Sequence, residues 1–187
     1  ASNQPVLSAN VSVNNLMVQG GSVDTNAKTL TVYGDLTGNG LGGTGTVSLA
    51  GSGRSLQGCN LPNVYINNNI VLGGRTTTNG NLTIPSAKRL TVGSRSIEIG
   101  GNLSVSVSNT SGDGLRMNTA GGEVIVAGAA SFNTPSYNYS ATGLGNLTAG
   151  TIRFRGSFSQ SNGSSSPGQS FVSTGTKAVF DGTSSQS

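Results

Sequence analysis

The 187-residue chain contains no histidine, no tryptophan and a single cysteine, Cys59. Without histidine, the sequence excludes a Ser-His-Asp or Cys-His catalytic centre, a histidine-ligated zinc ion and a histidine pH switch. One cysteine excludes an intramolecular disulfide, so we expect packing and hydrogen bonds to stabilise the fold. We interpret Cys59 as a small buried hydrophobic residue rather than a reactive thiol.

Charged residues are scarce as well, at 9% of the chain against about 25% in an average globular protein. Ten basic and six acidic residues leave a net charge of only +4, and aromatic residues make up 5%. This weak positive charge without interleaved aromatics argues against nucleic-acid binding. No run approaches the roughly 18 apolar residues of a membrane helix, so we expect no membrane span.

Glycine, serine, threonine and asparagine fill the chain in place of the missing charged residues, with 30 glycines alone. Good helix formers are too rare for a helical bundle. Disorder is also disfavoured, because Val, Ile and Thr cluster and the net charge is low. The composition therefore favours a folded all-β protein.

Short apolar pairs around a polar residue recur along the chain, which is the period-2 pattern of a strand with one buried face. Gly, Asn or Ser bounds most of them. The triplets are Val11–Val13, Leu30–Val32, Val47–Leu49, Val64–Ile66, Leu82–Ile84, Leu90–Val92, Ile97–Ile99, Leu103–Val105, Val124–Val126 and Ile152–Phe154.

The spacing of these triplets decides between two β architectures. Predicted strands begin at Leu82, Leu90, Ile97 and Leu103, so three strands take about 21 residues. Short strands that repeat about every 20–25 residues, with Gly and Asn at the corners, predict a parallel β-helix (β-solenoid) of about eight coils. The alternative is an antiparallel β-sandwich, which prefers strands of about five to six residues.

Longer sequence matches indicate internal repetition. Residues 10–18 (NVSVNNLMV) match 63–71 (NVYINNNIV), and AKTLTVYGDL at 27–36 matches AKRLTVGSRS at 87–96. We therefore interpret residues 1–187 as a single β-solenoid domain with sub-units of about 9–58 and 62–187. We expect it to be part of a longer repeat array or a filament.

Three stretches carry a family resemblance: NVYINNNIVLGG at 63–74, NLTIPSAKRLTVGSRSIEIGGNLSV at 81–105 and AVFDGTSSQS at 178–187. They resemble the repeats of large bacterial surface and secreted proteins, of which adhesins and autotransporter passenger regions are the best-known members. The resemblance implies a right-handed parallel β-helix and an extracellular or cell-surface location. It assigns no functional residue.

Enzymatic β-helices degrade polysaccharides with paired or calcium-binding carboxylates. Glu98 and Glu123 are separated by about 25 residues, close to one coil, so they are the best candidates for a stacked pair. Glu98, however, lies between the two inward residues Ile97 and Ile99, as an ordinary exposed strand residue does. We therefore predict a non-catalytic protein without cofactor or metal.

The candidate binding residues are basic or aromatic. Arg153 and Arg155 flank Phe154, so both should project from one outer face, while Lys88 and Arg89 could join Arg75 and Arg95 in a patch. Arginine pairs of this kind bind sulfated or carboxylated glycans. The competing interpretation is that isolated outward charges keep the surface soluble and prevent sheet pairing.

Two further features have a binding and a structural interpretation. Tyr137 and Tyr139 lie in an irregular segment and could stack on a sugar ring or cover a coil edge. Asn67, Asn68 and Asn69 are expected to form turns or ladders between coils.

Together these features predict a non-catalytic, extracellular structural or adhesive module of a bacterial surface or secreted protein, with a polysaccharide-binding or polysaccharide-degrading β-helix as the alternative. Because a solenoid end exposes an unpaired coil, neighbouring copies or repeats are the expected partners, joined end to end. Glycans or host-cell surfaces are the other expected partners.

Overall fold

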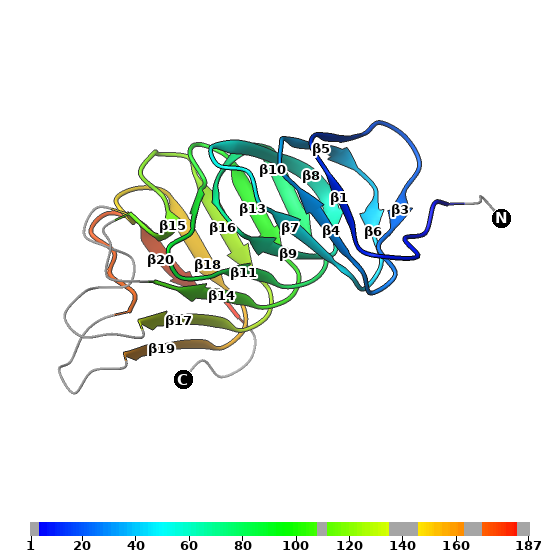
Figure 1. Cartoon of the computed structure of the whole chain (residues 1–187). Helices are drawn as coiled ribbons and strands as arrows, with labels where there is room; N and C mark the ends of the chain where they lie inside the picture. The colour runs from blue at the N-terminus through cyan, green and yellow to red at the C-terminus, as the bar shows by residue number, and fades with distance from the viewer. Residues whose placement is uncertain (1–3, 108–111, 135–145, 163–169, 183–187) are drawn as a thin grey trace.

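The computed structural model of the chain describes residues 4–107, 112–134, 146–162 and 170–182 (Figure 1). These residues form twenty β-strands. No helix that could cross a membrane occurs in the described ranges. Tyr137 and Tyr139, together with the side chain of Cys59, lie outside what the structure describes.

One sheet has eight strands, and the chain visits them in sequence order. They are β1 (Val11–Val13), β4 (Thr29–Val32), β7 (Thr46–Leu49), β9 (Asn63–Ile66), β11 (Leu82–Ile84), β14 (Leu103–Ser106), β17 (Ala130–Thr134) and β19 (Phe158–Asn162).

The second sheet has ten strands and bends around the other side of the molecule. Its main path is β2 (Leu16–Val18), β5 (Leu36–Asn39), β8 (Arg54–Leu61), β10 (Asn69–Thr78), β13 (Ser96–Ile99), β16 (Glu123–Val126), β18 (Thr151–Phe154) and β20 (Lys177–Phe180). Two more strands, β12 (Arg89–Thr91) and β15 (Gly114–Arg116), extend it from β10. A small third sheet pairs β3 (Val23–Asp24) with β6 (Leu41–Gly42).

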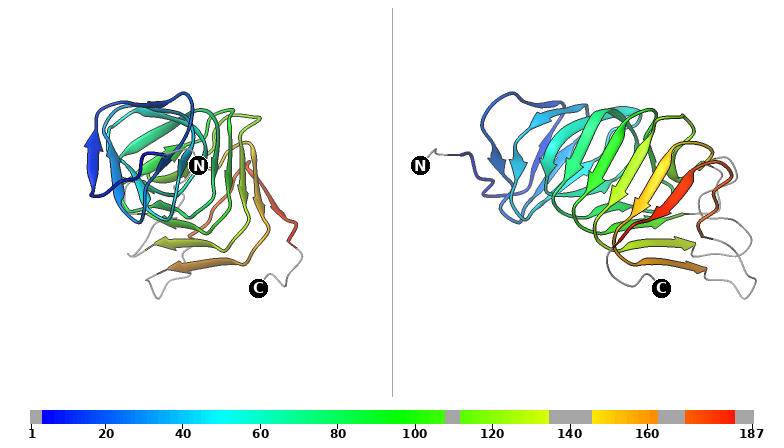
Figure 2. Two further views of the ribbon diagram at one scale, coloured as in Figure 1. Left: turned by 90° about the vertical axis from the view of Figure 1, so that its right-hand side faces the viewer. Right: turned by 180° about the vertical axis from the view of Figure 1, so that it is seen from behind.

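Neighbouring strands in each sheet are parallel and come from successive turns of the chain. Leu30, for example, pairs with Val47, which pairs with Val64 on the next coil. This arrangement confirms the predicted parallel β-helix, with eight strands stacked in one sheet (Figure 2). The antiparallel sandwich is wrong, because the strand pairs between the described residues are parallel and the sheets are formed by winding rather than by hairpins.

The period-2 pattern explains which side chains fill the interior. In β13, Ile97 and Ile99 are fully buried, whereas Ser96 and Glu98, which alternate with them, are partly exposed and face outward. The same alternation occurs in β16 and β18, so equivalent apolar residues stack from coil to coil. Burial of each such side chain is worth about 1.5–3 kcal/mol, which makes these columns the main stabilising feature.

The coils lengthen along the chain. Near the N-terminal end, the Thr25 hydroxyl donates to the carbonyl of Gly42 on the next coil, across a sequence separation of 17 residues. Near the C-terminal end, the Ser161 hydroxyl donates to the side chain of its register partner Asn133 across 28 residues. The predicted coil length of about 20–25 residues lies between these values. The molecule is therefore wider at its C-terminal end, as both views in Figure 2 show.

The interior changes from aliphatic to aromatic as the coils widen. All five phenylalanines of the chain cluster at the C-terminal end, linked by ring contacts at centroid distances of 5.0 to 6.3 Å. Phe132 and Phe154 are fully buried at its centre. Larger side chains fill the larger cross-section and maintain close packing. The remaining members are Phe158, Phe171 and Phe180.

A column of asparagines stabilises the corner that leads into the eight-stranded sheet. The amide oxygen of Asn63 accepts the backbone N–H of Asn81 at 3.0 Å, and that of Asn81 accepts the N–H of Asn102 at 2.8 Å. Asn102 accepts the N–H of Ala129 in the same way. Each asparagine thus binds a backbone group of the next coil where the sheet hydrogen bonding begins.

The predicted role of the asparagines at 67–69 is confirmed in part. Asn68 donates from its side chain to the carbonyl of Ala50 on the preceding coil, at 2.9 Å, and the backbone N–H of Asn69 donates to the Asn68 side chain. The Asn67 backbone N–H donates to the carbonyl of Leu49. This turn is therefore bound to the coil before it.

Candidate functional site

Arg153 and Arg155 lie on the outer surface of β18 and just beyond it, as the alternation around buried Phe154 predicts. The strand sits between β16 and β20, so side chains from three coils surround the two guanidinium groups. Their neighbours decide whether they can bind an external ligand.

Arg153 is engaged by carboxylates from the coils on both sides. Its Nε donates to Oε1 of Glu123 at 3.0 Å, and its Nη1 lies 3.3 Å from Oδ2 of Asp181. Hydrogen bonds from Arg153 to Glu123 and then to Asp181 raise the pKa of the guanidinium above its ordinary value. Arg153 therefore connects three successive coils by ion pairs.

Arg155 shares a carboxylate with Arg75. Nη1 of Arg155 lies 3.9 Å from one oxygen of Glu98, and Nη2 of Arg75 lies 3.7 Å from the other. All three side chains are at least 43% exposed, so each of these pairs contributes little to stability.

The outer face of the ten-stranded sheet is thus a network of alternating charge rather than a basic patch. Three arginines (Arg75, Arg153 and Arg155) face three carboxylates (Glu98, Glu123 and Asp181), so the charges in the network cancel. The alternation around Phe154 predicts that Arg153 and Arg155 face outward, but their carboxylate partners lie on other coils, where no local pattern indicates them.

The register separates Glu98 and Glu123, the two candidates for a stacked pair of carboxylates. Glu123 pairs with Ser96, and Glu98 pairs with Ile125, so the two carboxylates are offset along neighbouring strands. Each carboxylate is ion-paired to arginine.

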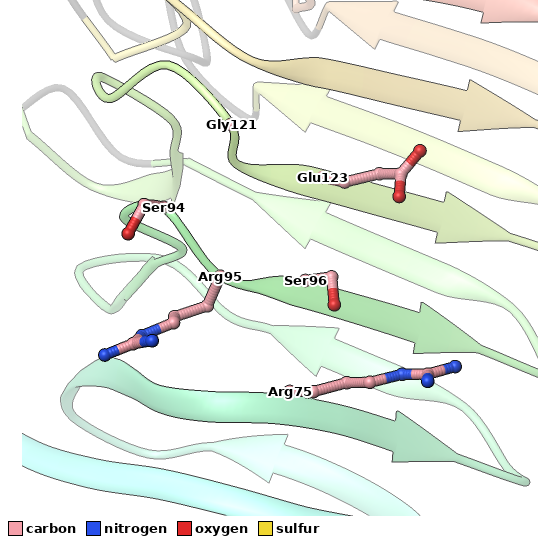
Figure 3. A pocket seen from close by; sticks show the side chains of 6 residues that line it. All are labelled: Arg75, Ser94, Arg95, Ser96, Gly121 and Glu123. Atoms are coloured by element: carbon pink, nitrogen blue, oxygen red, sulfur yellow. The ribbon is translucent and has the colours of Figure 1, made fainter.

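A shallow depression of about 400 Å³ lies on the same face. Two arginines, Arg75 and Arg95, and two serines, Ser94 and Ser96, line it together with Gly121 and Glu123 (Figure 3). The side chains of Arg75 and Arg95 point in opposite directions along the sheet (Figure 3). Arg95 is exposed and joins none of the ion pairs between described residues. The depression therefore offers one guanidinium outside the network beside serine hydroxyls, which suits a surface contact with an anionic or hydroxylated group.

Arg89 and Arg75 are held by different parts of the ladder. Arg89 pairs in register with Asn69 and Gly114, whereas Arg75 precedes Thr76, which pairs with Ile97. The two arginines therefore lie on different faces of the coil. Arg89 Nη1 donates to the carbonyl of Gly112 at 3.2 Å, and its Nε is buried without a hydrogen-bond partner in the described part of the chain. Arg89 thus acts as a contact between coils.

A metal centre would need several ligating side chains in one place. The described ranges hold no group of three or more His, Cys, Asp or Glu side chains that could bind a metal ion.

No protein-family model matches the chain, and comparison with curated proteins and solved structures found none that is similar. The fold and the surface chemistry are therefore the basis for a functional proposal.

Proposed function

We propose that this chain is a non-catalytic structural or adhesive module of a bacterial surface or secreted protein, acting outside the cell. The observation that carries the proposal is the parallel ladder, in register over eight strands of one sheet, with stacked apolar residues inside. A stack of this kind makes a stiff body in which each coil supports the next. The resemblance to bacterial β-helix proteins supports the same conclusion.

The outer charges fit a structural role. Arg153 and Arg155 pair with carboxylates of neighbouring coils, so these side chains stabilise the stack and neutralise one another. Alternating charges on a sheet face also oppose sideways association with other sheets.

Adhesion would use the outward side chains that lie outside the network. Arg95, in the depression with Ser94 and Ser96, is the best such group on the described surface. Sulfated or carboxylated glycans are the matching ligands, because a guanidinium binds their anionic groups through paired hydrogen bonds.

The test combines a glycan array with a reducing-end assay on acidic polysaccharides. An adhesive module binds sulfated or carboxylated glycans, and Arg95→Gln weakens this binding several-fold. Arg54→Gln is the matched control, because Arg54 is exposed on a different part of the ten-stranded sheet. A structural module binds nothing on the array, and new reducing ends would overturn the non-catalytic proposal in favour of a polysaccharide-degrading enzyme.

A further inference from the structure

The strands of the eight-stranded sheet contain no charged residue. All ten basic and six acidic residues of the chain lie outside them, and the ion-pair network belongs to the ten-stranded sheet. The strands of the uncharged sheet follow one another along the length of the molecule (Figure 1). The protein therefore has one charged sheet face and one uncharged sheet face.

Hydroxyl side chains form a continuous row on the uncharged face. Alternation around the buried residues gives each strand a central outward residue, and the register aligns these residues from coil to coil. From β4 to β14 this hydroxyl row consists of Thr31, Ser48, Tyr65, Thr83 and Ser104. None of the five hydroxyl groups forms a hydrogen bond to another described residue. The described structure thus leaves their hydrogen-bonding capacity unused.

Two exposed tyrosines lie on the same face, in the middle coils. Tyr65 belongs to the hydroxyl row on β9, and Tyr33 directly follows buried Val32 at the end of β4. The two side chains are 37% and 53% exposed, respectively. Two coil spacings of about 4.8 Å and one two-residue step of about 6.6 Å along the strand place their Cα atoms about 12 Å apart.

The chemistry of this face disfavours the common macromolecular partners. Nucleic acids bind to lysine and arginine side chains that neutralise the phosphates, and the strands of this sheet have none. A lipid surface requires a broad apolar face, usually flanked by basic residues. The centres of protein interfaces are apolar and depleted in serine, whereas hydroxyl groups dominate the row described above. The face therefore suits an uncharged ligand that is itself rich in hydroxyl groups.

A neutral polysaccharide has both of the required features. Its hydroxyl groups donate and accept hydrogen bonds, as serine, threonine and tyrosine hydroxyl groups do. The C–H groups on the face of a sugar ring pack against an aromatic ring, and a tyrosine keeps its hydroxyl group for a further hydrogen bond. Because about 12 Å separates the two tyrosines, one sugar ring cannot cover both. An extended, linear chain of sugars can.

We propose that the outer face of β4, β7, β9 and β11 binds an uncharged, linear β-linked polysaccharide. Its sugar rings pack on Tyr33 and Tyr65, and its hydroxyl groups bond to the hydroxyl row. The inference rests on the proposed adhesive role and deepens it, because it names a second binding face and a ligand class different from the anionic glycans that suit Arg95.

The first test is isothermal titration calorimetry of the unchanged chain with cellohexaose and mannohexaose, two uncharged β-linked probes. We expect at least one of them to bind, while glucose binds too weakly to detect. The affinity should be the same in dilute buffer and at about 1 M salt, because no charge takes part. No binding of either hexasaccharide, or a large loss of affinity in high salt, would overturn the inference.

The second test locates the contact by substitution. Tyr33→Ala and Tyr65→Ala should each weaken binding several-fold, and the double variant should abolish it. Tyr33→Phe and Tyr65→Phe keep the rings and should retain most of the affinity. Val71→Ala is the matched control, because Val71 is an exposed apolar residue on β10 of the other sheet. If Tyr65→Ala does not fold, Tyr33→Ala decides, because that ring is more exposed.

Full affinity in the double variant, or an equal loss in Val71→Ala, would contradict the placement of the ligand. A dimer that the tyrosine substitutions dissociate in the absence of sugar would assign the face to a second copy of the chain instead. Arg95→Gln should leave hexasaccharide binding unchanged, and the tyrosine substitutions should leave binding of anionic glycans unchanged. Failure of this inference is therefore distinguishable from failure of the proposed function.

Discussion

Glycine and asparagine act as a pair at the corner before the eight-stranded sheet. Gly80 precedes Asn81, and Gly101 precedes Asn102. A Cβ on Gly101 would lie 2.5 Å from Oδ1 of Asn81, the atom that accepts the Asn102 N–H. The asparagine of one coil therefore occupies the space that a side chain on the next would need. This explains why the two residues recur together.

The asparagine column predicts a specific loss on truncation. Asn81→Ala removes the acceptor of the Asn102 N–H, a 2.8 Å hydrogen bond, and should lower the free energy of unfolding by about 1 kcal/mol. Asn81→Asp keeps an acceptor oxygen and should lose less. Urea unfolding followed by circular dichroism measures both, and equal stability of Asn81→Ala and the unchanged chain would show that the column is dispensable.

Single strands were largely predictable, because the period-2 pattern marks both the strand and its buried face. β13 and β18 match the predicted triplets, with Ile97, Ile99, Ile152 and Phe154 inside. The outward direction of Arg153 followed from the same pattern. The alternation depends only on residues that are adjacent in the chain, so it can be predicted from the sequence.

The matched segments AKTL (27–30) and AKRL (87–90) show that a local sequence match does not determine the position of a strand in the coil. Both form the same turn, in which Ala27 and Ala87 have positive φ values of 56° and 61°. The strand that follows is β4 of the eight-stranded sheet in one case and β12 of the ten-stranded sheet in the other. The motif therefore encodes a turn into a strand, and not a position in the coil.

The ion-pair network was unpredictable for a related reason. A constant coil of about 25 residues would stack Glu98 on Glu123. In the structure, however, Glu98 pairs with Ile125, and Ser96 lies opposite Glu123, so this coil is longer than the average spacing suggests. Coil length depends on the corners, which follow no short pattern, so contacts between coils require the structure.

The arginine network predicts a salt-dependent contribution to stability. Arg153→Gln removes both ion pairs and leaves Glu123 and Asp181 without that partner, so it should lower the denaturation midpoint at low ionic strength. The effect should shrink at about 1 M salt, where charges are screened within roughly 3 Å. Arg75→Gln is the control, because that side chain is 72% exposed and has one contact at 3.7 Å. Equal effects of the two substitutions would contradict the bridging role of Arg153.

The aromatic cluster predicts unequal costs for its members. Phe154→Ala empties a fully buried position and should cost about 3–5 kcal/mol of unfolding free energy. Phe180→Ala removes a ring that is 54% exposed and should cost about 1 kcal/mol or less in the monomer. Chemical denaturation at low protein concentration compares the two. If Phe180→Ala lowered the unfolding free energy as much as Phe154→Ala does, the ring of Phe180 would have to be covered.

At the scale of the whole molecule, each coil contacts only its neighbours, so stability should vary along the axis. Strands β1 and β11 are equally short, but β11 pairs on both sides and β1 on one. Amide hydrogen exchange should therefore be at least about tenfold faster in Val11–Val13 than in Leu82–Ile84. Uniform protection of the two strands would contradict this nearest-neighbour behaviour.

The widening of the coils has a practical consequence. The sequence separation across one coil grows from 17 residues to 28 residues while the strands keep their alignment. The corners therefore absorb about eleven additional residues without disturbing the ladder. A foreign peptide of similar length, grafted at a corner of a narrow turn, should leave the architecture intact. The chain is thus a natural starting point for a display scaffold, with loops presented along a rigid axis at intervals of about 4.8 Å.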